Sequence, residues 1–182
     1  MREAQQLFAE RGFHATPIDE ISRRAGFTRG AFYANFEDKA DIFLTVLEAR
    51  RALTFRELDA LIADTPDEHV LALLGQWMVR VLVDDPLADA SAEFGLFAAK
   101  HPAHRVRLQT NQTAITAAVA SMVGRYRSGH GIALVVDDST FAVMVVATFT
   151  GFAQLARVRG VERVDEELGM ALTCLWTGAL LP

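Results

Sequence analysis

The stretch TPIDEISRRAGFTRGAFYANFEDK, from Thr16 to Lys39, decides the fold of this chain. It predicts two short helices that are joined by a tight turn and followed by the start of a long helix. Thr16 is a suitable N-cap, and Pro17 suits the first helical position because that position needs no hydrogen-bond donor. Gly26 stands where the first helix must end, since glycine takes the left-handed conformation at little cost. The order helix, glycine-bearing turn, helix predicts a helix-turn-helix.

The second helix of this pair is expected to present one face for contact. Thr28 is placed to cap it, and Phe27 before the cap is expected to be a hydrophobic anchor. Phe32 and Phe36 are four residues apart and are predicted to point into the core. A helix of two turns is not stable alone in water, so its neighbours must hold it and its outer face stays free. We therefore predict that the helix from Thr28 to Asn35 lies in the major groove of duplex DNA.

The outer face carries the candidate DNA contacts. Arg29 is the best candidate for a guanine edge, because its guanidinium group can make two bonds to one base. Gly30 lets the backbone approach the duplex. Tyr33 and Lys39 are expected to hold phosphates, as are Thr28 and the N-terminus of the preceding helix. The predicted DNA-binding residues are Thr16, Thr28, Arg29, Gly30, Tyr33, Asn35 and Lys39.

The run AQQLFAERGF (Ala4 to Phe13) and the pattern T-x-x-x-x-I-S-x-x-A-G-F-T-x-G-x-F-Y-x-N-F-x-D-K (Thr16 to Lys39) together resemble the N-terminal domain of TetR-type transcriptional regulators. The resemblance covers about the first quarter of the chain. Asn35 stands where many members carry histidine, and Ala31 where many carry threonine. The resemblance implies a dimer that forms through the last two helices as a four-helix bundle. It also implies an effector site in the C-terminal domain.

Composition indicates a globular protein of one or two domains, because 51% of the 182 residues are hydrophobic and only five are proline. The single cysteine, Cys174, excludes an internal disulfide, fits a reducing cytoplasm and is expected to be a small core residue. No charged-then-apolar leader follows Met1, and the most apolar run, residues 141–156, is shorter than a membrane span. We therefore expect a cytoplasmic protein with no membrane partner.

The formal net charge of −5 is unusual for a DNA-binding protein. Residues 1–51 carry eight basic and eight acidic side chains, so the deficit lies in the remainder, with ten basic and fifteen acidic. An acidic body would repel DNA from the wrong face while a few placed cations hold the right one. Arg23 and Arg24 lie either near the DNA backbone or on the solvated surface.

Helical periodicity extends over the rest of the chain, and no β-alternation is sustained. Asp38 is predicted to cap a long helix that runs to about Ala63. Its buried edge is predicted to be Ile42, Val46, Ala49 and Leu53. Further helices are predicted to start near Thr65, Asp85, Pro102, Asp137 or Asp138, and Asp165. The predicted fold is all-α with about nine helices. A three-helix helix-turn-helix domain spans residues 1–45, and a helical effector-binding and dimerisation domain spans residues 46–182.

The helix around Phe141 to Ala156 is apolar nearly all round, and its small residues Ala147 and Gly151 allow close approach. Such a helix must be buried on every side, either by a partner chain or within the monomer. A dimer would place two recognition helices about 34–36 Å apart, which suits a palindromic operator.

A small-molecule pocket needs polar groups that converge on aromatic ones. Asn111 and Gln112 interrupt the apolar stripe of their helix, and Glu93 shares an edge with Phe97. A satisfied buried amide or a surface edge is the alternative reading of these polar residues. The predicted ligand-binding residues are Trp77, Glu93, Phe97, Asn111, Gln112 and Phe149.

Taken together, the sequence predicts a dimeric, ligand-responsive repressor that binds a palindromic operator and is released from it by a small-molecule effector. We expect no enzyme activity and no cofactor. We also expect no metal site, because His101 and His104 straddle a proline break with no second pair nearby. The alternative is a helical ligand carrier or enzyme with a non-functional helix-turn-helix, for which Glu93 is the one candidate titratable group.

Overall fold

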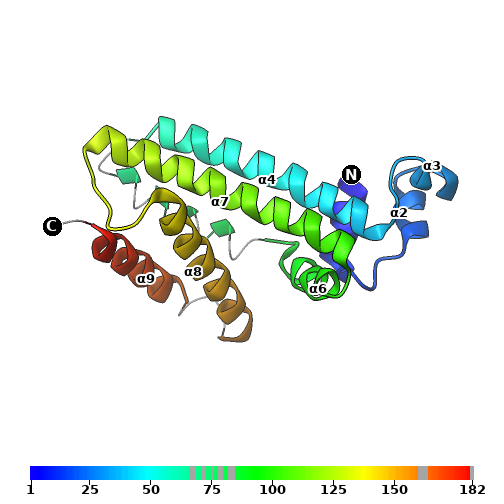
Figure 1. Ribbon diagram of the computed structural model, residues 1–182. Helices are drawn as coiled ribbons and strands as arrows, with labels where there is room; N and C mark the ends of the chain where they lie inside the picture. The colour runs from blue at the N-terminus through cyan, green and yellow to red at the C-terminus, as the bar shows by residue number, and fades with distance from the viewer. Residues whose placement is uncertain are drawn as a thin grey trace. The chain divides into compact units, whose positions relative to one another are not determined.

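The computed structural model describes residues 1–65, 69–70, 73–74, 76–77, 80–81, 85–159 and 164–180. Figure 1 shows the helices of this part of the chain. They are α1 (Arg2–Arg11), α2 (Ile18–Arg24), α3 (Arg29–Tyr33), α4 (Lys39–Ala63), α6 (Ala88–Ala99), α7 (Pro102–His130), α8 (Asp138–Arg159) and α9 (Val164–Ala179). The described residues between 69 and 81 are also helical, whereas residues 66–68 of the helix start predicted at Thr65 lie outside the described residues. The all-α prediction is confirmed.

The chain divides into two compact units. Unit 1 comprises Met1–Arg56 and Pro86–Gln112, and unit 2 comprises Glu57–Asp85 and Thr113–Pro182. The division falls within α4 and α7, so each of these long helices contributes residues to both units. The helix-turn-helix therefore shares its compact unit with α6 and with the first turns of α7.

Unit 1 has an aromatic core. Phe8 in α1, Phe13 after it, Phe43 in α4 and Phe94 in α6 are each no more than 2% exposed. The ring centroids of Phe8 and Phe43 lie 4.8 Å apart, and Phe94 lies 5.0 Å from both Phe13 and Phe43. Edge-on and tilted ring pairs at these separations are attractive beyond the area that they bury. This aromatic cluster packs α1, α4 and α6 together.

The turn between α2 and α3 follows the sequence prediction in its backbone. Gly26 adopts a φ of +73° and ends α2, and the N–H of Phe27 donates to the carbonyl of Ser22 at 2.9 Å. These features form a Schellman turn. Thr28 caps α3, because its hydroxyl oxygen accepts from the N–H of Ala31 at 3.2 Å. The prediction that Phe27 is a hydrophobic anchor is wrong, since its side chain is 66% exposed.

Thr16 does not cap α2. Pro17 occupies the N-cap position of this helix, which begins at Ile18. The Thr16 side chain is fully buried, and its hydroxyl lies 2.7 Å from the carbonyl oxygen of Gly12 and 3.2 Å from that of Leu7. The last carbonyls of a helix lack intrahelical partners, so the buried hydroxyl satisfies the end of α1 instead of the start of α2.

Asp38 caps α4 as predicted, with its Oδ1 accepting from the N–H of Asp41 at 2.8 Å. Ile42 and Val46 are buried as predicted, but Ala49 and Leu53 are exposed. The reason is the extent of the aromatic cluster, which covers only the first turns of α4. Periodicity alone did not indicate where this cover ends.

In unit 2, α8 begins as predicted, with the N–H of Thr140 donating to Asp137 Oδ1 at 2.9 Å. It packs along α9, and the rings of Phe141 and Trp176 meet edge-on at 5.6 Å. An isolated bridge joins Leu134 to Leu180. The preceding helix, α7, runs to His130. Cys174 is exposed on α9, so its prediction as a core residue is wrong.

We predict that Phe94→Ala will destabilise unit 1 by about 3–5 kcal/mol, because it removes a ring from the centre of the aromatic cluster. Leu96 lies on the same helix but is 73% exposed, so Leu96→Ala should change stability by no more than about 0.5 kcal/mol. Urea unfolding followed by circular dichroism measures both variants. Equal losses in the two would show that the cluster does not hold α6.

Candidate nucleic-acid interface

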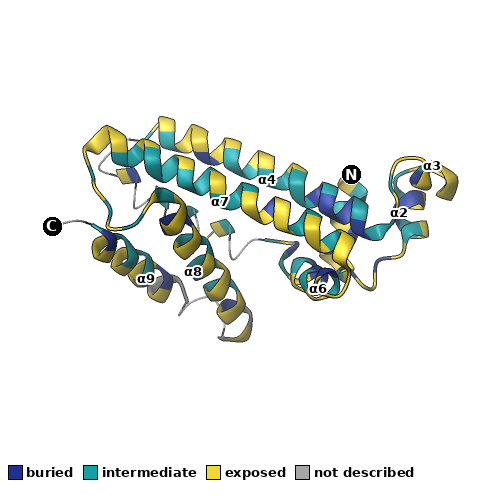
Figure 2. Cartoon of the chain, in the orientation of Figure 1, coloured by how far each residue is buried: buried dark blue, intermediate teal, exposed yellow. Residues whose placement is uncertain are grey.

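The candidate interface is the outer side of α3. The helix is five residues long, and Phe32 on its inner side is only 5% exposed. Phe36 packs against the same core from just beyond the helix. Arg29, Gly30 and Tyr33 are exposed, and in Figure 2 the ribbon of α3 is drawn largely in the colour of exposed residues. The neighbouring structure thus holds α3 from one side and leaves the other side in solvent, as predicted.

Arg29 is free to change partners. Its guanidinium group lies 3.1 Å from the Asp19 carboxylate and 5.7 Å from the centre of the Tyr33 ring. Contact with Tyr33 and the charge of Asp19 raise the pKa of Arg29 above its usual value. The side chains of Arg29 and Asp19 are 64% and 65% exposed, and such ion pairs add little to stability. If Arg29 left Asp19 to contact the edge of a base, the fold would therefore lose little stability.

The side chains of Thr28 and Asn35 hold the two ends of α3. Thr28 caps the first turn, and the Nδ2 of Asn35 donates to the carbonyl of Ala31 at 2.9 Å. Both residues are exposed. Each therefore keeps hydrogen-bonding capacity toward solvent while it fixes the helix, because a hydroxyl and an amide have more donors and acceptors than these bonds use.

Two predicted DNA-binding residues have roles inside the protein. The Thr16 side chain is fully buried, so it cannot contact a phosphate in this fold. The Nζ of Lys39 donates to the carbonyl of His14 at 2.8 Å and lies 4.9 Å from the centre of the Phe13 ring. Burial lowers the pKa of Lys39, against the opposing effect of Glu93. Sequence spacing did not indicate these contacts because they join positions 25 residues apart.

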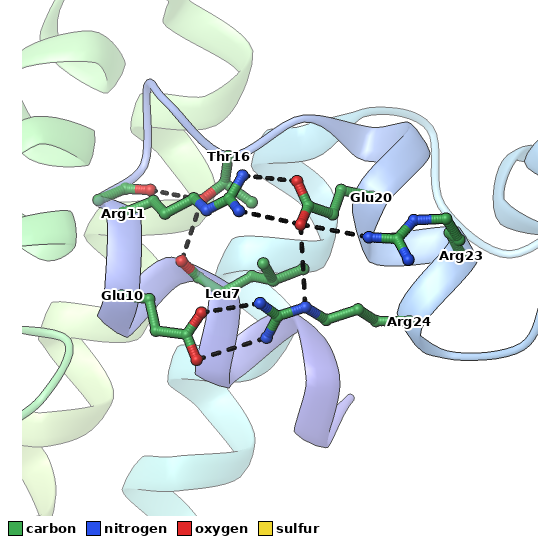
Figure 3. A network of polar contacts seen from close by, with 8 residues as sticks. Leu7, Glu10, Arg11, Thr16, Glu20, Arg23 and Arg24 are labelled. Atoms are coloured by element: carbon green, nitrogen blue, oxygen red, sulfur yellow. Dashed lines mark hydrogen bonds and ion pairs between the residues drawn. The ribbon is translucent and has the colours of Figure 1, made fainter.

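A network of ion pairs joins α1 to α2 (Figure 3). The carboxylate of Glu20 lies 2.5 Å from Arg11 and 3.5 Å from Arg23, and Glu10 lies 3.0 Å from Arg24. The hydrogen bond from Arg24 is the main cause that lowers the pKa of Glu10. Arg24 is therefore tied to α1. The Arg23 side chain is 73% exposed, which makes it the better candidate of the two for a DNA backbone contact.

The predicted ligand-binding residues divide between the two units. Glu93, Phe97, Asn111 and Gln112 lie in unit 1, whereas Trp77 and Phe149 lie in unit 2. Glu93 accepts a hydrogen bond from the N–H of His14 at 2.8 Å. Asn111 is 7% exposed, and its side-chain oxygen accepts from Arg51. The structure thus gives both polar groups partners within unit 1, and Asn111 is a satisfied buried amide.

Trp77 differs from these residues. Among the buried side-chain polar atoms of the described residues, the Nε1 of Trp77 is the one that lacks a hydrogen-bond partner. A buried donor without an acceptor is costly, so a ligand or water with an acceptor atom would be favoured beside it. Trp77 is therefore a predicted ligand-binding residue whose buried N–H is available to donate to a ligand.

His101 and His104 have other partners. The His101 ring stacks on Phe97 at 3.9 Å, and His104 Nε2 lies 3.2 Å from a carboxylate oxygen of Asp38. Among the described residues, no group of three or more potential metal ligands comes together.

The apolar surface of α8 and α9 is open in the single chain. Residues 138–156 of α8 are long and apolar enough to span a membrane by composition alone, and only 11% of the most apolar part of this stretch is buried. Val143 is 55% exposed, and Met170 on α9 is 66% exposed. An open groove of about 730 Å³ runs between the two helices and is lined by residues that include Gly151, Leu155 and Cys174. Burial within the monomer, one of the two alternatives for this helix, is not what the structure shows.

Comparison with known proteins gives a sequence match at the N-terminus. Residues 1–46 match the family described as bacterial regulatory proteins, tetR family. The HTH-type transcriptional repressor BepR of Brucella suis is 48% identical over 48 residues, which are 26% of this chain and 23% of that protein. The HTH-type transcriptional activator FasR of Mycolicibacterium smegmatis is 40% identical over 45 residues, 25% of this chain and 20% of that protein. The chain thus matches less than a quarter of the length of these curated relatives.

Solved structures match nearly the whole chain in fold. A putative TetR-family transcriptional regulator from Mesorhizobium loti superposes with a TM-score of 0.75 at 16% identity, covering 99% of this chain and 94% of that one. The regulator FadR from Bacillus subtilis, solved in complex with stearoyl-CoA, gives a TM-score of 0.75 at 16% identity, covering 97% and 96%. An N-terminal helix-turn-helix followed by a helical domain is the architecture that they share with this chain.

We predict that Lys39→Ala will lower the stability of unit 1 by about 1–3 kcal/mol, because it removes a charged hydrogen bond and a cation–π contact. Arg23→Ala removes an exposed charge from the same domain and should leave stability unchanged. Thermal unfolding without DNA measures both. A Lys39→Ala protein that stays stable but loses binding to duplex DNA would show that Lys39 contacts DNA instead.

Proposed function

We propose that this chain is a dimeric, ligand-responsive transcriptional repressor of the TetR type, which binds a palindromic operator and leaves it when a small-molecule effector binds. The match of residues 1–46 to the tetR family supports this proposal. The proposal rests on the exposure of the outer side of α3. Its inner residue Phe32 is buried, while Arg29 and Tyr33 are exposed. The protein would act in the cytoplasm, where bacterial DNA lies.

In the proposed complex, α3 enters the major groove and Arg29 leaves Asp19 to make two hydrogen bonds to a guanine edge. Tyr33, Thr28 and Asn35 hold phosphates, which positions the domain but carries no sequence information. Gly30 presents no side chain, so the backbone comes close to the duplex.

The proposed dimer forms through α8 and α9. A stable interface buries roughly 800 Å² on each partner, with an apolar centre. The open apolar groove between α8 and α9, with exposed Val143 beside it on α8, offers such a centre. A twofold dimer carries two symmetry-related copies of α3, which is the reason for a palindromic operator.

The proposed effector is a small molecule that binds the C-terminal domain. FadR of Bacillus subtilis was solved with stearoyl-CoA, which makes a ligand in this fold a natural expectation. The unpaired Nε1 of Trp77 is the group here that favours a ligand with an acceptor atom. The effector must bind the DNA-free conformation more tightly than the DNA-bound one, because equal affinity would shift nothing.

Selection of bound duplexes from a random pool tests the function. The proposal predicts an enriched palindrome, here called the operator, with half-sites about 10 base pairs apart or a multiple of that spacing. Failure to retain any duplex, together with turnover of a small molecule, would favour the alternative of a ligand carrier or enzyme with an inactive helix-turn-helix.

We predict that Arg29→Ala will weaken operator binding roughly 5- to 150-fold and relax the preference for one guanine in each half-site, since a base-reading arginine is worth about 1–3 kcal/mol. Arg125→Ala is the matched control, because it removes an equally exposed guanidinium group that pairs with Asp59 in unit 2. Fluorescence anisotropy at several salt concentrations measures both. Unchanged affinity and base preference in Arg29→Ala would remove the proposed contact.

We predict that Leu155→Glu will convert the dimer to a monomer, because it places a charge in the apolar groove of α8 and α9. Leu96→Glu introduces the same charge at an exposed apolar residue of α6 and should leave the dimer intact. Sedimentation velocity at micromolar concentration distinguishes the two states. A wild-type protein that is already monomeric would contradict the interface.

A further inference from the structure

The phenyl ring of Phe27 faces solvent although its backbone is fixed. The N–H of Phe27 donates to the carbonyl of Ser22 at 2.9 Å, which closes the turn after α2. The next residue, Thr28, is the N-cap of α3 and is fixed by its bond to Ala31. The ring nevertheless is 66% exposed. Because the backbone on both sides of Phe27 is fixed, the direction of its Cα–Cβ bond is fixed too, and this position leaves the ring exposed.

Two common local packing motifs would cover this ring, and the structure uses neither. In a Schellman turn the residue after the glycine often packs back on the helix that has ended, which here would offer Ile21. In a hydrophobic staple the residue before an N-cap packs on the fourth helical residue, which here is Phe32. Both Ile21 and Phe32 belong to the buried core cluster of unit 1, and Phe27 is neither a member of that cluster nor one of the partly buried residues packed against it. The core is therefore complete, and the exposed ring is free to make another contact.

The position of Phe27 indicates what that contact is. Residues 26–30 form one continuous exposed segment that leads from the turn into α3, and Arg29 lies two residues further on. In helix-turn-helix complexes this end of the second helix lies nearest the base edges. The apolar group that the major groove offers there is the 5-methyl group of thymine, and phenylalanine is one of the side chains that contact it.

We propose that Phe27 reads a thymine in each half-site of the operator through contact with its 5-methyl group. This inference rests on the proposed function, since it requires α3 to enter the major groove. It assigns a specificity role to a side chain that precedes the helix, in addition to the guanine contact of Arg29. Arg29 recognises guanine through hydrogen bonds. Phe27 recognises thymine because their contact removes both the methyl group and the phenyl ring from water.

The test uses the full-length protein and the selected operator, in which the implicated thymine is replaced by uracil so that only the methyl group is lost. Wild-type affinity should fall roughly fourfold, the effect of burying one methyl-sized group. Phe27→Ala should bind the thymine and uracil duplexes equally well. Phe27→Leu keeps an apolar side chain and should retain part of the preference, which separates loss of the contact from a change in the turn.

Leu96→Ala is the control, because Leu96 is an apolar residue of the same unit that is 73% exposed but lies on α6. The Leu96→Ala protein should discriminate between the two duplexes as well as the wild type does. Melting temperatures of all variants verify the fold. An operator without a common thymine in its half-sites would overturn the inference, and so would an equal loss on uracil in the wild type and in Phe27→Ala. Retention of no duplex by the wild type would instead overturn the proposed function, and the thymine contact with it.

Discussion

Packing of four phenylalanine rings, most of them edge-on, is the interaction on which the rest of unit 1 depends. Phe8, Phe13, Phe43 and Phe94 come from α1, the loop after it, α4 and α6, and they fix these helices around one centre. Since three longer elements supply this core, α3 contributes to it mainly through Phe32. A helix too short to be stable alone is thereby held firmly and keeps its outer side in solvent. The fold therefore leaves the outer side of α3 free for the proposed contact with DNA.

Charged groups connect the same helices around the rings. Arg107 on α7 bonds to Asp41 and to Glu48 on α4, and the Glu48 contact is the main cause that raises its pKa. Glu93 on α6 and Lys39 at the start of α4 both bind the backbone of His14, at its N–H and at its carbonyl respectively. Hydrogen bonds to charged groups are stronger than neutral ones. Within unit 1, α4 and α6 are thus hydrogen-bonded directly to the loop between α1 and α2.

Short-range hydrogen bonds made the turn and the cap of the helix-turn-helix predictable from the sequence. The partners of other polar residues were harder to predict. The roles of Gly26 and Thr28 depend on residues within five positions of each, so the sequence reveals them. The sequence predicted phosphate contacts for Thr16 and Lys39 because both are polar and near α3. Lys39 instead bonds to His14, 25 residues away, and the buried hydroxyl of Thr16 bonds to Gly12 and Leu7 at the end of α1, four and nine residues before it. The sequence showed that residues 141–156 are apolar nearly all round, but composition cannot tell whether the same chain or a second chain covers such a helix.

Amide hydrogen exchange with and without the selected operator shows whether the outer side of α3 is the surface that meets DNA. We expect slowed exchange on DNA addition to concentrate in peptides that cover residues 26–36, while the core peptides around Phe43 and Phe94 change little. Protection that leaves residues 26–36 unaffected and appears elsewhere on the chain would contradict the account.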